Sequence, residues 1–99
     1  MLLIVASLSH CFLALWFQAY MSRELWLGNV PPGMTEGMCI THFVDLALPH
    51  PYKVLLRTAP NGYSRWGIAT WQTVDDATLV MSQEGLKWPD GRYMVVRLA

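Results

Sequence analysis

The fold is decided by residues 52–71, which read YKVLLRTAPNGYSRWGIATW. Two runs in this stretch, 52–58 and 63–71, are rich in β-branched, aromatic and other apolar residues and are typical of strands. Between them lies Asn61-Gly62, a dipeptide that favours a tight turn joining antiparallel strands. The stretch therefore predicts a β-hairpin with a short turn.

Patterns on both sides of the hairpin predict two helices and two further strands. Thr35 followed by Glu36 is typical of a helix start, because the hydroxyl accepts from an unpaired backbone N–H and the carboxylate suits the positive end of the helix dipole. Thr73 has the same role before a second helix. The elements expected, in chain order, are a strand at 24–30, a helix between Thr35 and Pro49, strands at 52–58 and 63–71, a helix between Thr73 and Gly85, and a strand at 92–98.

This β-α-β-β-α-β order is typical of an α+β, ferredoxin-like sandwich, in which two helices cover one face of a four-stranded antiparallel sheet. We expect one such domain at residues 22–99, since the chain is too short for two. The second face of the sheet is left without helices. Such a face is usually polar, so aromatic side chains on it are candidates for binding.

The N-terminal residues 1–21 are expected to form an apolar extension outside the domain. Residues 2–22 carry no charged side chain, and the first one is Arg23. A run of this length is typical of a membrane span; a signal peptide, a natural start at Met21 and a segment packed on the domain are the other interpretations. A membrane is an expected partner only if the run is an anchor, and the domain itself is expected in the nucleus or cytoplasm.

Composition argues against several classes of protein. The formal net charge is zero, whereas strong nucleic-acid binders are usually basic. No nucleophile–base pair or phosphate-binding glycine loop is present, so we expect no enzymatic activity. We also expect no metal or cofactor, because these cysteines and histidines lack ligand spacing: Cys11, Cys39, His10, His42 and His50.

Two segments resemble the RNA-recognition-motif family. Residues 25–30 (LWLGNV) match its first-strand motif of apolar, aromatic, apolar, any residue, asparagine and apolar. Residues 64–71 (SRWGIATW) lie on its third-strand motif. Trp66 takes the first aromatic position there, but Ile68 replaces the second stacking aromatic. The other departures are Ser64 and Arg65, and further matches are Gly67 and Trp71.

The resemblance implies binding of single-stranded RNA on the sheet face without helices. Strand alternation places Trp26 and Trp66 on that face, where each indole can stack a base. Asn29 either contacts a base or holds the following loop. The predicted RNA-binding residues are Trp26, Trp66, Ile68, Asn29, Lys53, Arg57, Ser64, Arg65 and Arg97. The departures from the motif and the zero net charge favour an alternative, a protein–protein interaction module of the same fold.

Overall fold

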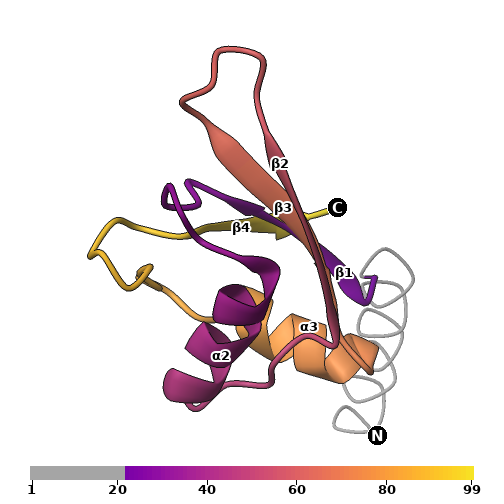
Figure 1. Cartoon of the computed structure of the whole chain (residues 1–99). Coiled ribbons are helices and arrows are strands. Elements are labelled where there is room, and N and C mark those ends of the chain that lie inside the picture. The colour runs from indigo at the N-terminus through magenta and orange to yellow at the C-terminus, as the bar shows by residue number, and fades with distance from the viewer. Residues whose placement is uncertain (1–21) are drawn as a thin grey trace, which may run out of the picture.

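The computed structural model describes residues 22–99, which form the predicted α+β sandwich (Figure 1). The sheet is antiparallel with strand order β2-β3-β1-β4, and both helices lie on one of its faces. The ferredoxin-like fold class is thus confirmed. The elements are β1 (Glu24–Gly28), α2 (Glu36–Asp45), β2 (Lys53–Thr58), β3 (Arg65–Thr70), α3 (Val74–Met81) and β4 (Val95–Leu98).

Both helices begin where the sequence predicts. The Thr35 hydroxyl accepts a hydrogen bond from the Met38 N–H at 3.1 Å, and the Thr73 hydroxyl accepts one from the Asp76 N–H at 3.1 Å. Each threonine is extended and satisfies one of the first N–H groups, which have no partner inside the helix.

The ends of the elements differ from the sequence predictions. The first helix ends at Asp45 because Ala47 adopts a left-handed backbone (φ 58°), before Pro49 is reached. The second ends at Met81, before Gly85. The last strand begins at Val95 rather than at residue 92, because residues 88–92 fold into a turn closed by hydrogen bonds between their own backbone groups.

The hairpin turn is wider than Asn61-Gly62 alone predicts. The Gly62 N–H donates to the Ala59 carbonyl at 2.9 Å, so Pro60 and Asn61 are the central residues of the turn. A two-residue turn of the expected kind needs positive φ at both Asn61 and Gly62, but only Gly62 has it (φ 78°). The Asn61 side-chain oxygen instead accepts from the backbone N–H groups of Tyr63 and Ser64, at 2.9 and 3.2 Å.

The core lies between the sheet and the helices. Leu25 and Leu27 of β1 and Ala69 of β3 are fully buried there, as the alternation of strand side chains requires. Trp71 is buried as well, and its indole N–H donates to the Pro49 carbonyl at 2.8 Å. The other core residues are Val30, Met34, Cys39, Phe43, Val54, Ala77, Val80, Trp88 and Met94.

The outer edge of the sheet at β2 is contacted by the first residue of α2. The Leu56 N–H, which points away from β3, donates to a carboxylate oxygen of Glu36 at 3.4 Å. This contact links α2 to the edge strand.

The predictions for residues 1–21 fall outside the described part of the chain. Within residues 22–99, neither helix has the length and apolar character that crossing a bilayer requires. The same residues contain no group of three histidine, cysteine or acidic side chains positioned to hold a metal ion.

Gly67→Ala should destabilise the domain by about 1–3 kcal/mol, because overpacking a filled core has a cost of that size. A Cβ at this position would lie 2.8 Å from the Leu55 carbonyl oxygen and 2.8 Å from Leu56 Cδ2. Urea denaturation measures the loss. Gly37→Ala is the control, since a Cβ there meets open space; equal stability changes in the two variants would contradict the prediction.

Candidate nucleic-acid interface

The strand register collects the outward side chains into cross-strand rows, because directly opposed residues of antiparallel strands project to the same face. The rows lie on the side of the sheet away from the helices. The first row holds Arg57, Trp66, Gly28 and Val95, the second Leu55, Ile68, Trp26 and Arg97, and the third Lys53, Thr70 and Glu24. Seven of these residues form the surface that we call the sheet face: Trp26, Trp66, Ile68, Lys53, Leu55, Arg57 and Arg97.

Trp26 and Trp66 are brought together at the centre of the sheet face. Their ring centroids are 6.5 Å apart and their planes are 23° from parallel. Both indoles are half-buried, since they pack beside each other on neighbouring strands. Gly28 makes this arrangement possible, because a Cβ there would collide with the six-membered ring of Trp26.

Cationic side chains flank the two indoles. The Arg97 guanidinium lies over the Trp26 ring, 5.4 Å from its centroid, an arrangement in which the ring quadrupole attracts the cation. Arg57 lies opposite Trp66 and donates to the Leu56 carbonyl at 2.9 Å. Lys53 occupies the far end of the same strand. The acidic residue on this side of the sheet is Glu24, in the row farthest from Trp66.

A pocket of about 280 Å³ adjoins the two indoles at the ends of their strands. Ser64 lines it, as do Tyr63 and Arg92, which the sequence did not single out as binding residues. Tyr63 is 91% exposed. Its position directly after the hairpin turn is the signal that could have identified it, because an aromatic side chain at a loop tip cannot join the core.

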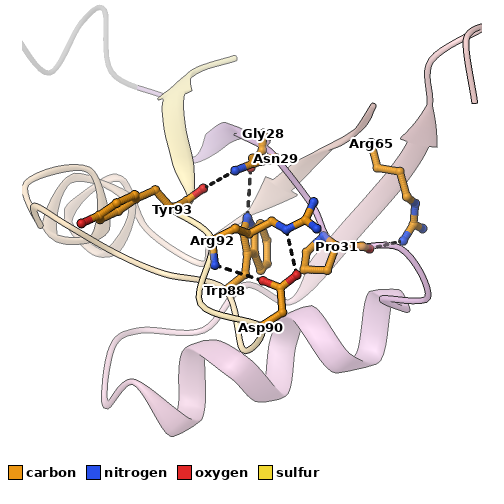
Figure 2. A network of polar contacts seen from close by, with 8 residues as sticks. All are labelled: Gly28, Asn29, Pro31, Arg65, Trp88, Asp90, Arg92 and Tyr93. Atoms are coloured by element: carbon orange, nitrogen blue, oxygen red, sulfur yellow. Dashed lines mark hydrogen bonds and ion pairs between the residues drawn. The ribbon is translucent and has the colours of Figure 1, made fainter. Parts of the chain in front are cut away.

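Asn29 and Arg65 hold loops in place (Figure 2). Asn29 has a left-handed backbone (φ 61°), and its side-chain amide donates to the Tyr93 carbonyl at 2.8 Å. Arg65 Nη1 donates to the carbonyls of Pro31 and Met34, at 2.8 and 2.9 Å. The Asn29 side chain thus bonds the segment before β4 and not the following loop, whereas Arg65 holds the loop after β1 and also borders the pocket.

Trp88, which the sequence did not link to the interface, anchors the end of β1 (Figure 2). Its indole N–H donates to the Gly28 carbonyl at 3.0 Å in a buried contact. Its ring stacks on His42 of α2, with centroids 5.9 Å apart, and the His42 ring bonds the Lys87 carbonyl at 2.6 Å. The strand end that carries the indole pair is therefore tied to α2 and to the loop before β4.

Cys39 lies in the core beneath this region. Burial raises the pKa of its thiol to about 11. The positive charge of Arg65 acts to lower this pKa, and the negative charge of Glu36 acts to raise it. The thiolate is the reactive form of cysteine, so Cys39 acts as an apolar core residue near neutral pH.

Comparison with models of known protein families gives no match, and a search of curated protein sequences gives none either. The resemblance to the RNA-recognition-motif family therefore stays a hypothesis that rests on the two strand motifs.

Cys39 should react slowly with iodoacetamide in the folded chain and rapidly in urea. The raised pKa keeps its thiol protonated until the pH approaches 11, and the side chain is fully buried. Mass spectrometry of the peptide that contains Cys39 measures the alkylation separately from that of Cys11. Rapid alkylation at pH 8 without denaturant would contradict the burial of this thiol.

Proposed function

We propose that the sheet face binds single-stranded RNA, with bases stacked on Trp26 and Trp66. The observation that carries the proposal is the near-parallel indole pair, 6.5 Å between centroids, on the side of the sheet without helices. Large aromatic side chains in such a place gain little from core packing. They offer instead a π surface that any nucleobase can stack on.

The side chains beside the two indoles support the binding of consecutive nucleotides along the sheet face. Ile68 lies directly opposite Trp26 and supplies an apolar surface for a ribose or a base edge. It cannot stack as an aromatic ring does, so each bound nucleotide depends mainly on an indole. Base–aromatic stacking contributes roughly 1–3 kcal/mol per base, which suits a site for a few nucleotides with moderate affinity.

The local positive charge of the sheet face suits a negatively charged ligand. An RNA strand that crosses the two indoles would pass beside three cationic side chains, Lys53, Arg57 and Arg97. The whole chain has zero formal net charge. A local field of this kind can attract a polyanion without a basic protein as a whole. Binding is then expected to combine stacking with a small number of phosphate contacts.

The pocket at the strand ends extends the path by one further nucleotide. Tyr63 can stack on the nucleobase that follows the one on Trp66, and Ser64 lines the same pocket. Arg92 is oriented by Asp90, whose carboxylate accepts from its Nε at 2.8 Å. The pocket therefore combines an aromatic ring, a hydroxyl and a guanidinium, groups that suit a base with its phosphate.

Trp66→Ala should weaken the binding of short single-stranded RNA by about 5- to 150-fold, since losing one stacked base removes roughly 1–3 kcal/mol. Fluorescence anisotropy with a labelled, random-sequence RNA measures the affinity, and circular dichroism checks that the fold survives.

Leu79→Ala is the matched control, because Leu79 is an exposed apolar residue on α3, away from the sheet face. This control should bind as tightly as the unaltered chain. Equal affinity of the Trp66 variant and the unaltered chain would remove the proposal.

The logarithm of the affinity should fall with the logarithm of salt concentration with a slope of about −2, if about three phosphates are neutralised on a single strand. Arg57→Gln should reduce that slope by about 0.7, the share of one phosphate contact. Lys87→Gln is the control, since its ammonium lies over the Tyr93 ring, 5.0 Å from the centroid. A slope that Arg57→Gln leaves unchanged would exclude a phosphate contact at that residue.

A further inference from the structure

A second concave surface lies on the helix layer, away from the sheet face. It is a groove of about 510 Å³ between the solvent-facing side of α2 and the turn that precedes β4. We call it the α2 groove. Its apolar lining comes from Met34, Met38 and Pro89, and Met38 is 51% exposed. Sites that hold a small molecule or a side-chain cluster commonly have volumes of roughly 300–1,000 Å³, so this groove is large enough for a ligand.

Gly37 is a helical residue that the fold itself does not require to be glycine. It lies in the first turn of α2, where glycine is less favourable than alanine. Its φ is not positive, and a Cβ would meet nothing within 4 Å. No contact inside the domain therefore requires the absence of a side chain at Gly37. This absence does widen the α2 groove, which Gly37 lines.

Asp45 is a second residue that works against its own helix. It is the last residue of α2, where the negative end of the helix dipole favours a cation and disfavours a carboxylate. Within residues 22–99 the one ion pair joins Asp90 and Arg92, so no described cation neutralises Asp45. Asp45 lines the α2 groove, where a cation from another molecule would meet both the charge of this residue and the negative end of the helix dipole.

These features define the chemistry of a ligand. The lining contains apolar side chains, two threonines, the His42 ring and one carboxylate. It has no lysine or arginine, so it does not suit a nucleic-acid backbone. We propose that the α2 groove binds a short peptide segment of a partner protein that carries one large apolar side chain and one lysine or arginine. The apolar side chain lies over Gly37 and against Met38, and the cation reaches Asp45.

The helix geometry sets the spacing between these two anchors. Gly37 and Asp45 are eight positions apart on α2, which is about 12 Å at the helical rise per residue. An extended peptide advances roughly 3.3 Å per residue. The large apolar residue and the basic residue are therefore expected about three to four positions apart in the partner segment.

The test uses the full chain and labelled peptides of the sequence Gly-Trp-Ser-Gly-Lys-Gly and its reverse. Anisotropy titration should show that at least one of them binds at least about threefold tighter than its own counterparts with glutamate for lysine or alanine for tryptophan. Asp45→Lys should remove or reverse the preference for lysine over glutamate. Gly37→Leu should fill the groove and abolish binding.

Both substitutions should preserve the fold. Asp45→Lys supplies a cation at the C-terminal end of α2, which the helix dipole favours, and Gly37→Leu replaces a helical glycine by a better helix former. Thermal melting checks this. Glu84→Lys is the matched charge reversal, at an exposed position that does not line the groove, and it should leave peptide binding unchanged.

Three results would overturn the proposal: no binding of any of these peptides, equal binding of the lysine and glutamate peptides, or a preference that survives Asp45→Lys. Displacement of the peptide by short RNA would assign the groove to nucleic acid instead. Failure here is distinguishable from failure of the sheet-face proposal, because the Asp45 and Gly37 variants should retain the RNA affinity of the unaltered chain.

Discussion

The register between β1 and β3 determines what the helix-free side of the sheet presents. Gly28 lies opposite Trp66, and Trp26 lies opposite Ile68. A slip of one residue would turn Trp26 toward the helices and Leu25 toward solvent. Burial of Leu25 and Leu27 therefore fixes the register, and the same constraint puts the two indoles on adjacent positions of one surface. Packing of the core thus determines which side chains form the candidate interface, although the core and the sheet face have no residue in common.

The strand ends around this interface are held by side chains that bond backbone carbonyls. The Trp88 indole N–H donates to the Gly28 carbonyl, and the Asn29 amide donates to the Tyr93 carbonyl (Figure 2). The guanidinium of Arg65 donates to two carbonyls of the loop after β1. Segments far apart in the sequence are fastened at one place in this way. A surface held so firmly loses little conformational freedom when a ligand binds, which raises the affinity that a few contacts can provide.

Local chemistry made much of the fold predictable. The helix starts at Thr35 and Thr73 follow from hydroxyl capping, and the indole positions follow from strand alternation. The anchoring role of Trp88 was not predictable, because its hydrogen bond to the Gly28 carbonyl joins residues 60 positions apart and no local pattern encodes it. The turn was misjudged for a related reason: the Asn61 side chain satisfies two following amides, which favours a wider loop than the dipeptide alone suggests. The α2 groove depends on two packed segments and has no sequence signature.

The contact between Glu36 and the Leu56 N–H has a consequence for self-association. An open sheet ends in two strands whose outward amides can template the addition of another chain. At β2 one of these amides is occupied by a carboxylate, and the strand also carries Lys53 and Arg57. The opposite edge, β4, is only four residues long and includes Arg97. Both edges thus discourage strand-to-strand polymerisation, so the domain can present Trp26 and Trp66 at its surface in water without growing into fibrils.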